Sequence, residues 1–541
     1  MKSKKKPFLK SLLALAILSA TNSAIAANVP SGTELSSRQE LVRNNGSEPA
    51  TLDPHKAESD VEFNIISDFF DRLVRSKRDG TIEPRLAESW ENQDNKIWTF
   101  HLRPGITWSS GEPITAQDVV WSWKRLVDPE TGSPYASYPG TLFIENAGDI
   151  AEGKKPVSTL GVKALDSETL QVTLSQPNSA FLFMLDHNSM VPVSKSAVER
   201  NGSKWTLPGN IVSSGAYHLS DWVVNEKVVA LRNKIFWNNP QTVIEKVTYL
   251  PISSGTADVN RYKAGEIDIT ATIPEILFSS LKKSIPEQIR LSPYFSTYYY
   301  EFNTTKAPFN DPRVRRALNM ALDKDIIAGK VLGQGQVPAW RVSQPEIGGV
   351  KIKAADYGDW SREKRIAEAK KLLGEAGFNA THPLKFNLLY NTSESHQRIA
   401  IAASSMWKKN LGVEAKLQTQ EWKTLLDTKR TGNYEIVRYG WVADYSDASS
   451  FLNNYRSGDK QNSSGYSNPV YDEMLIKASL ATSPEERGKY YQQAEDILAE
   501  DVPSIPVYHA IKTNLVKPYI GGFSMNERGE YFTEDLYIKK H

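Results

Sequence analysis

A cation, bulky aromatic groups and an anion follow one another near residue 440. Arg438 stands just before Gly440 and Trp441, and Asp444 comes next, followed by Tyr445. Opposite charges beside aromatic side chains suit the two charged ends of a zwitterion, because an ionised carboxylate forms a charge-assisted bond with an ammonium group. A structural alternative stays open, in which Asp444 caps or turns the chain and Arg438 pairs with a neighbouring acid.

A second aromatic cluster occupies residues 296–303, with the sequence STYYYEFN. Strand alternation there places Tyr298 and Tyr300 on one face and Tyr299 on the other. The chain has 13 Trp and 23 Tyr against 18 Phe. Such amphipathic rings suit a wet ligand cleft, although most of them are expected to pack in the core.

The usual motifs of catalysis and metal binding are absent from the sequence. We find no Gly-x-Ser-x-Gly, His-Glu-x-x-His, P-loop or dinucleotide motif. No two of the eight histidines lie three to five residues apart, as a helical metal pair requires. The chain has no cysteine, which excludes disulfides and thiolate chemistry. We therefore expect no enzyme, no metal and no cofactor, although composition leaves open a pair of carboxylates of the glycosidase type.

These candidate groups must be positioned by several domains. At 541 residues the chain predicts roughly three or four domains of about 150 residues each. The first ten residues carry five lysines, and without them 60 basic side chains face 63 acidic ones, a net charge of −3. This balance argues against a nucleic-acid partner, which needs a basic surface.

The N-terminus has the three parts of a secretory signal. Lysines precede a short apolar stretch at residues 12–18, and small residues end at Ala26. The apolar stretch is shorter than the roughly 18 to 20 residues of a spanning helix. We predict a signal peptide at residues 1–26, cleaved near Ala26, and a mature chain free in the periplasm, since lipid attachment needs a cysteine.

Strand and helix patterns alternate along the body of the chain. Alternation predicts strands at residues 97–102, 170–174 and 384–390. Helical patterns run from Thr115 to about Leu126, from a Ser361 cap to Gly377, and over residues 484–500. The mixture indicates an α/β or α+β protein of several lobes.

Several long stretches of the sequence together form a recognisable pattern. They are LAESW (86–90), WTFHLRPG (98–105), WSSG (108–111), PITAQDV (113–119), FN (302–303) and APFNDPRVRRAL (307–318). In this order they resemble the extracytoplasmic solute-binding proteins of peptide ABC transporters. Others resemble the oligopeptide branch of this family, namely YNTSESH (390–396), MWKKNLGV (406–413), QEWKT (420–424) and YIKKH (537–541). The resemblance extends over essentially the whole mature chain.

The resemblance implies an α/β, bilobal periplasmic binding-protein fold with an extra inserted domain and a cleft that closes like a Venus flytrap. It implies a first lobe of residues 27–70, 195–296 and 512–541, an inserted domain of residues 71–194, and a second lobe of residues 297–511. It further implies a monomeric receptor, not an enzyme, which binds short peptides and delivers them to a membrane permease. Peptide main chain would be held as an added strand.

The resemblance also implies the roles of particular side chains. Asp444 would anchor the α-amino group of the peptide. The cationic groups that meet peptide carboxylates would be Arg438, Lys429, His396 and Lys330. The cleft would be lined by Glu58, Tyr135, Asn391, Trp422, Gly440 and Trp441.

Several positions depart from the family pattern. Val442 stands where relatives often have Cys, which implies that the loop beside Asp444 is held by packing alone. Lys429 replaces the usual Arg, exchanging a bidentate fork for a point charge. Asp60 replaces an apolar residue, and residues 446–448 read Ser-Asp-Ala in place of Asn-Glu-Pro. A relative specialised for murein peptides or another small solute, and more remotely an exported hydrolase, are therefore kept as alternatives.

Overall fold

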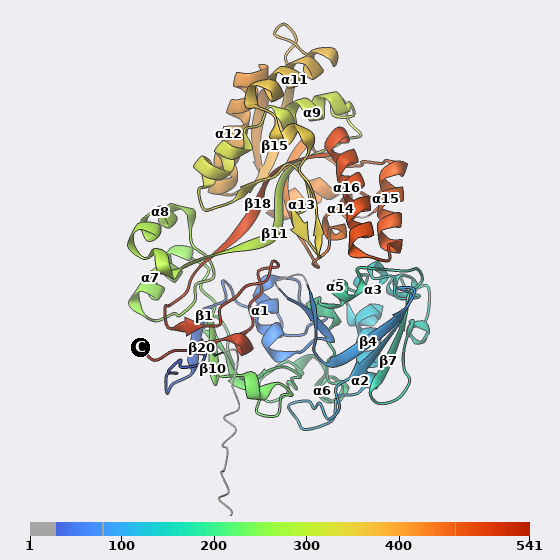
Figure 1. Ribbon diagram of the computed structural model, residues 1–541, viewed down its shortest axis with the longest axis vertical. Coiled ribbons are helices and arrows are strands. Elements are labelled where there is room, and N and C mark those ends of the chain that lie inside the picture. Colours follow the sequence, from blue (N-terminus) through green and yellow to red (C-terminus); the bar gives the residue numbers. More distant parts are fainter. Residues whose placement is uncertain (1–28, 78–80, 421, 460) are drawn as a thin grey trace, which may run out of the picture.

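The structure, a computed structural model, describes residues 29–77, 81–420, 422–459 and 461–541. The predicted signal peptide lies outside these residues. Within them, no helix combines the length and the apolar character needed to cross a membrane. Figure 1 shows an upper and a lower half joined by two long strands.

One part of the lower half is built on a four-stranded sheet in the order β1-β10-β9-β8, in which β1 is parallel to β10 and the other pairs are antiparallel. Its core draws on residues 41–70, 191–269 and 516–538, so segments far apart in sequence share one interior. The strands are β1 (Glu40–Asn44), β8 (Tyr217–Val223), β9 (Lys227–Arg232), β10 (Lys246–Leu250), β19 (Ile520–Gly521) and β20 (Tyr537–Ile538), and the helices are α1 (Asp60–Phe69), α6 (Lys195–Asn201), α7 (Gly255–Ala264) and α8 (Glu275–Ser284).

The other part of the lower half is an antiparallel sheet in the order β4-β5-β7-β6. Its core draws on residues 73–190, joined by Tyr445 from the upper half. The strands are β2 (Val74–Ser76), β3 (Ile82–Pro84), β4 (Ala87–Gln93), β5 (Ile97–Leu102), β6 (Val162–Ala164) and β7 (Thr169–Thr173), and the helices are α2 (Ala116–Val127), α3 (Tyr138–Thr141), α4 (Ala147–Ala151) and α5 (Phe181–Leu185).

The upper half is built on a six-stranded sheet in the order β12-β18-β11-β17-β15-β16. Its strands are β11 (Ile289–Phe302), β12 (Val337–Pro338), β15 (Lys385–Asn391), β16 (Glu414–Gln420), β17 (Ile436–Val442) and β18 (Ser504–Leu515), with a hairpin of β13 (Glu346–Ile347) and β14 (Val350–Lys351) beside them. Its helices are α9 (Pro312–Met320), α10 (Lys324–Ile326), α11 (Arg362–Glu375), α12 (Glu394–Leu411), α13 (Trp422–Arg430), α14 (Ser449–Leu452), α15 (Pro469–Leu480) and α16 (Pro484–Asp501).

The strands β11 and β18 run antiparallel from one half to the other (Figure 1). The register of their pairing shifts between Pro293 and Thr297 and again between Tyr298 and Tyr299. At the lower end, Thr513 and Leu515 of β18 accept backbone hydrogen bonds from Ile273 and Thr270. These two strands therefore connect the two halves, and they are the expected hinge of the closing cleft that the resemblance implies.

The local predictions from sequence agree with these elements. The three predicted strands correspond to β5, β7 and β15, and the three predicted helices to α2, α11 and α16. Ser361 caps α11 by accepting from the backbone of Lys364. Tyr298 and Tyr300 have ring centroids 5.9 Å apart, whereas Tyr299 packs against Tyr439, as strand alternation requires.

Candidate functional site

The strand β17 has one free edge along its second half. β11 pairs with β17 from Ile436 to Val442, but β15 pairs with it only at Ile436 and Val437. From Arg438 to Val442 the other edge therefore has no strand partner among the described residues. Gly440 lies in the middle of this edge. A Cβ atom at position 440 would lie 3.4 Å from the Thr297 carbonyl oxygen, which is an ordinary contact. Packing against β11 therefore does not require glycine at this position.

Asp444 follows this strand and presents an unpaired carboxylate. Its backbone N–H donates to Ser450 Oγ at 2.9 Å, and its carbonyl accepts from Arg528 Nη1 at 3.4 Å. The carboxylate itself has no hydrogen bond or ion pair among the residues that the structure describes. Burial raises the pKa of Asp444 to about 6, against the opposing field of Arg528. The side chain is thus not the cap or turn residue of the structural alternative.

The Asp444 carboxylate lies at a cavity of about 470 Å³, here called the anchor cavity. Val442, Ala443 and Asp444 line it from the upper half, and Glu58, Asp60 and Tyr135 line it from the lower half. A smaller cavity of about 190 Å³, lined by Tyr135, Trp441 and Asp444, adjoins it. Both cavities lie between the halves. The volume of the larger one is within the range that is typical of ligand sites.

Tyr135 forms an aromatic wall of these cavities. Its ring lies 4.5 Å from the ring of His187 and 6.3 Å from that of Phe63. Burial, reinforced by Asp444 and Glu58, raises the pKa of Tyr135 far above its usual value. Burial also lowers the pKa of His187 to about 3, so both rings are uncharged at neutral pH.

A cation lies at the opposite end of the free edge. Arg438 donates to Asn391 Oδ1 at 3.1 Å, and its guanidinium lies 4.6 Å from the centre of the Tyr298 ring. No carboxylate pairs with it in the described part of the chain. Its Nε, together with His396 Nδ1 and Trp441 Nε1, is buried without a hydrogen-bond partner among the described residues. Buried polar atoms normally have partners, so these atoms point to a ligand.

His396 lies beside this cation without carrying charge. Its ring is 5.6 Å from that of Tyr298. Burial, and then the charge of Arg438, lower the pKa of His396 to about 3. The imidazole is therefore a neutral hydrogen-bonding group at pH 7.

The remaining predicted side chains lie in other surroundings. Lys429 is buried against Glu301 at 3.3 Å and lies 4.3 Å from the ring centre of Tyr439, so its charge is already met inside the protein. Lys330 is exposed on the π-helix Ile327–Leu332. Trp422 begins α13, but its side chain lies outside the described part of the chain.

The expectation that packing alone holds the loop beside Asp444 is wrong. The buried Asp447 carboxylate lies 3.3 Å from Arg487 and accepts from the Tyr491 hydroxyl at 2.6 Å and from Ser449 Oγ at 2.6 Å. These partners come from α14 and α16. A buried polar network centred on Asp447 therefore helps to hold this loop.

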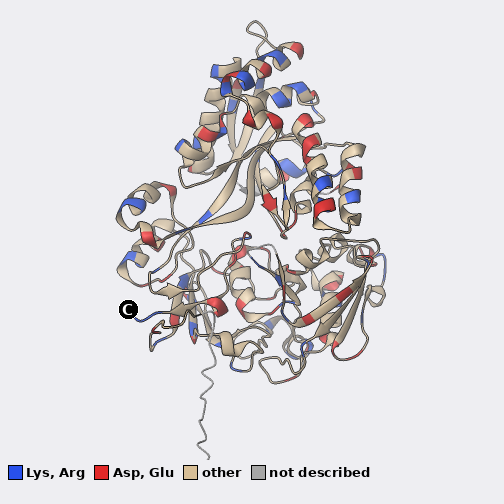
Figure 2. Cartoon of the chain, viewed as in Figure 1, with Lys and Arg blue, Asp and Glu red and all other residues tan. Residues whose placement is uncertain are grey.

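Sequence reasoning missed a buried ion network behind the anchor cavity. Asp186, fully buried, lies 3.1 Å from Arg72 and 2.6 Å from Arg528, and both arginines also pair with Glu530. Although burial raises the pKa of Glu530, Arg528 and Arg72 outweigh it and hold that pKa well below the usual value. Three segments far apart in the sequence supply these four residues, so no local pattern marks them. Figure 2 shows that charged residues occur throughout both halves.

The fold and this interlobe cavity define a bilobal binding protein that holds a ligand between two hinged lobes. The chain matches the family of bacterial extracellular solute-binding proteins, family 5 (middle), over residues 81–463. It therefore belongs to that family, as the resemblance implied.

Three relatives illustrate the family. The periplasmic oligopeptide-binding protein OppA of Escherichia coli is 51% identical over 97% of each chain. The periplasmic murein peptide-binding protein MppA of Escherichia coli is 44% identical over 97% of this chain and 98% of its own. The structure of Haemophilus influenzae OppA in complex with RPPGFSPFR has a TM-score of 0.79 at 42% identity and covers 94% of this chain and 100% of its own.

Proposed function

We propose that this protein is a periplasmic receptor of an ABC importer that captures short oligopeptides by their backbone and termini. The observation that carries the proposal is the free edge of β17, which has an unpaired carboxylate beyond one end and a cation at the other. A peptide added to this edge would receive backbone hydrogen bonds that are independent of its sequence. Similarity to OppA over nearly the whole chain supports the same conclusion.

The spacing of the two charged groups suits a short peptide. The six residue steps from Arg438 to Asp444 give an upper bound of about 20 Å on this distance, and because β17 ends at Val442 and the arginine side chain is long, the two charged groups lie closer than that. With its ammonium group at Asp444, a peptide antiparallel to β17 brings its carboxylate toward Arg438. We propose peptides of roughly two to five residues, the range that the family resemblance implies, held by strand addition.

The other site residues enter the proposal in two groups. His396, Lys330 and Lys429 would meet the carboxylates of peptides of other lengths, and Lys429 would have to leave its pair with Glu301 to do so. The cleft lining would comprise Glu58, Tyr135, Asn391, Trp422, Gly440 and Trp441.

We propose further that the signal peptide at residues 1–26 directs the protein to the periplasm, where it serves a membrane permease as a monomer without cofactor. The domain boundaries near residues 70, 194, 296 and 511 belong to the same proposal.

Similarity to MppA supports the alternative of murein peptides. Mass spectrometry of the ligand carried through native purification distinguishes ordinary oligopeptides from murein peptides. N-terminal sequencing of the exported protein, expressed with its own leader, tests whether the chain is cleaved near Ala26.

Binding of a tripeptide is expected to weaken below pH 6. The ammonium group binds the ionised carboxylate, and the pKa of Asp444 in the free protein is about 6. Pairing lowers this pKa in the complex, so binding releases a proton below pH 6 and affinity rises with pH through that range. At pH 5 the affinity for Ala-Ala-Ala should be about tenfold lower than at pH 7. It should fall again above about pH 8, where the peptide amine loses its proton.

Isothermal titration calorimetry from pH 4.5 to pH 9 measures this profile. The control is Asp444→Asn, whose weak binding should not change between pH 5 and pH 7. Equal affinity of the wild type at pH 5 and pH 7 would contradict the role of Asp444.

A further inference from the structure

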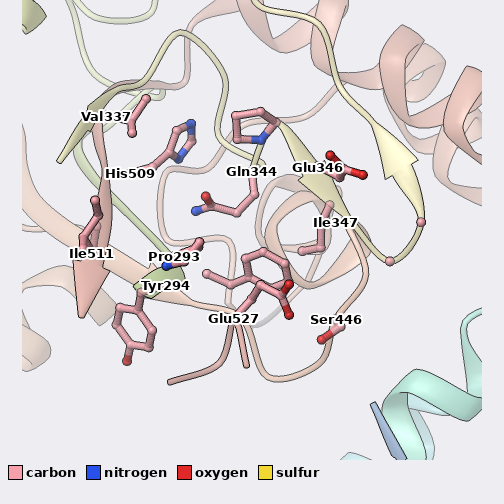
Figure 3. Close-up of a pocket in the computed structure, with 15 residues that line it drawn as sticks. Pro293, Tyr294, Val337, Gln344, Glu346, Ile347, Ser446, His509, Ile511 and Glu527 are labelled. Atoms are coloured by element: carbon pink, nitrogen blue, oxygen red, sulfur yellow. The ribbon is translucent and has the colours of Figure 1, made fainter. Parts of the chain in front are cut away.

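A further cavity of about 470 Å³ lies against the strands β11 and β18, and we call it the β18 cavity (Figure 3). Residues 293–295 of β11, residues 509–511 of β18 and Val337 of β12 line it. Residues 344–349, which include the first strand of the β13–β14 hairpin, form another side, and Glu527 completes the wall. The volume is within the range of about 300 to 1,000 Å³ that is typical of small-molecule pockets.

The β18 cavity is separate from the proposed peptide site. In the order of the sheet, β11, β18 and β12 all lie on the side of β17 that is opposite its free edge. Among the described residues, Tyr294 alone lines both the β18 cavity and the anchor cavity, and Asp444 does not line the β18 cavity. A ligand held here would therefore occupy a second site.

The hydrogen bonds of Thr297 determine which nitrogen of His509 carries the proton. The Thr297 hydroxyl donates to the Val342 carbonyl at 2.8 Å, because a carbonyl oxygen can only accept. Thr297 Oγ1 lies 3.0 Å from His509 Nδ1 and therefore accepts from it. Burial lowers the pKa of His509 to about 3, so the ring is neutral and its Nε2 is an acceptor. This side chain is buried, and Nε2 has no partner in the described part of the chain.

Gln344 contributes a second acceptor to the same cavity. Its Nε2 donates to the Ser296 carbonyl at 3.2 Å and to Thr297 Oγ1 at 3.3 Å, which fixes the orientation of the amide. The remaining amide atom, Oε1, can only accept, and it has no hydrogen bond among the residues that the structure describes. Gln344 is buried like His509, and Figure 3 shows both side chains beside the cavity.

The rest of the lining combines negative charge with apolar surface. Glu346 and Glu527 add two carboxylates, and no lysine or arginine is among the described residues that line the cavity. Phe295, Val337 and Ile347 supply aromatic and aliphatic walls. Acceptors and carboxylates favour a cationic donor, because a hydrogen bond to an ionised group is roughly twice as strong as a neutral one. The apolar walls favour a hydrocarbon body on that cation.

We propose that the β18 cavity is a second ligand site, which takes a small organic amine with an apolar body. An ammonium group has three N–H donors, and the cavity offers it the acceptors of His509 and Gln344 and the carboxylates of Glu346 and Glu527. The site does not depend on peptide binding, so it goes beyond the proposed function.

Calorimetry at pH 7 with three probes that share one aromatic ring tests the proposal. The probes are 2-phenylethylamine, 2-phenylethanol and phenylacetate, which are cationic, neutral and anionic at this pH. The charge-assisted bonds of the amine should make it bind about tenfold to a hundredfold more tightly than the alcohol, and phenylacetate should bind most weakly. Absence of binding by the amine, or equal affinities for the amine and the alcohol, would overturn the proposal.

Glu346→Lys places a positive charge at the cavity. Glu346 is exposed on β13, so the substitution does not disturb the core. It should lower the affinity for 2-phenylethylamine by about tenfold and change the affinity for 2-phenylethanol far less. The matched control is Glu88→Lys on β4, an exposed position that does not line the cavity, and it should keep the affinity of the wild type. Full affinity for the amine in Glu346→Lys would show that it binds elsewhere.

Val337→Trp decides the matter if Glu346→Lys fails to fold. Val337 is 49% exposed, so a larger side chain there can fill part of the cavity without disturbing the core. This variant should bind both the amine and the alcohol more weakly, whereas Val470→Trp on α15, which does not line the cavity, should bind them as the wild type does. Unchanged binding in Val337→Trp would contradict the placement.

Asp444→Ala separates this site from the anchor cavity, where an ammonium group could also bind. Because Asp444 does not line the β18 cavity, the variant should keep the affinity for 2-phenylethylamine. Loss of amine binding in Asp444→Ala, together with its retention in Glu346→Lys, would assign the amine to the anchor cavity and overturn the proposal.

Discussion

Replacement of Asp444 by alanine is expected to lower the affinity for Ala-Ala-Ala by about two to three powers of ten. The carboxylate is unpaired in the described structure, and it lies at a cavity bounded by both lobes. In the complex it would pair with an ammonium group away from bulk water. Removing one partner of a buried ion pair costs on the order of 3 to 5 kcal/mol, which sets this magnitude. Calorimetry at pH 7 measures the loss.

Two controls separate an amine anchor from a general acidic field. Asp60 lines the same cavity, but its carboxylate is 60% exposed and lies 3.3 Å from Lys512. Asp60→Ala should therefore change the affinity far less than Asp444→Ala. Acetylation of the peptide amine should weaken binding to the wild type strongly and to Asp444→Ala hardly at all. If the Asp444→Ala variant binds the free tripeptide as well as the wild type, Asp444 is not the anchor.

Much of the fold could be predicted from sequence because its signals are local. The helix α11 follows from a Ser361 cap and an apolar stripe, and the strand β5 from the alternation of its side chains. These patterns depend on neighbours within one element. The sharing of one core by residues 41–70, 191–269 and 516–538 has no local signal, and only the family resemblance indicated the segmented first lobe.

The candidate site divides in the same way. The stretch from Arg438 to Asp444 is continuous, so its order of cation, aromatic groups and anion is visible in the sequence. The burial of Lys429 against Glu301 joins α13 to β11, and no pattern in either segment indicates it. A cavity of about 470 Å³ likewise joins β11, the β13–β14 hairpin and β18, which meet only after folding. Long-range packing decides which charges stay free for a ligand.

The second large effect is expected on stability, from Asp186→Ala. The Asp186 side chain is fully buried, and it pairs with Arg72 at 3.1 Å and with Arg528 at 2.6 Å. It also accepts from the backbone N–H of Ser76 at 2.9 Å. Without it, Glu530 would be the one carboxylate paired with these two buried guanidinium groups among the described residues, and a buried charge left without its partner costs about 3 to 5 kcal/mol. We expect the midpoint of urea unfolding, followed by tryptophan fluorescence, to fall clearly.

The matched control is Asp149→Ala in α4. It removes a surface ion pair in the same region, in which the Asp149 carboxylate lies 2.9 Å from Lys155 Nζ. Water and salt screen that pair, so its loss should leave the unfolding midpoint nearly unchanged. Asp186→Asn keeps the size of the side chain and an acceptor for Ser76, and it should fall between the two alanine variants. Because Arg528 holds the Asp444 carbonyl, Asp186→Ala should also weaken tripeptide binding, whereas Asp149→Ala should not. Equal midpoints for the two alanine variants would show that Glu530 suffices for both arginines, and that the network behind the anchor cavity does not depend on Asp186.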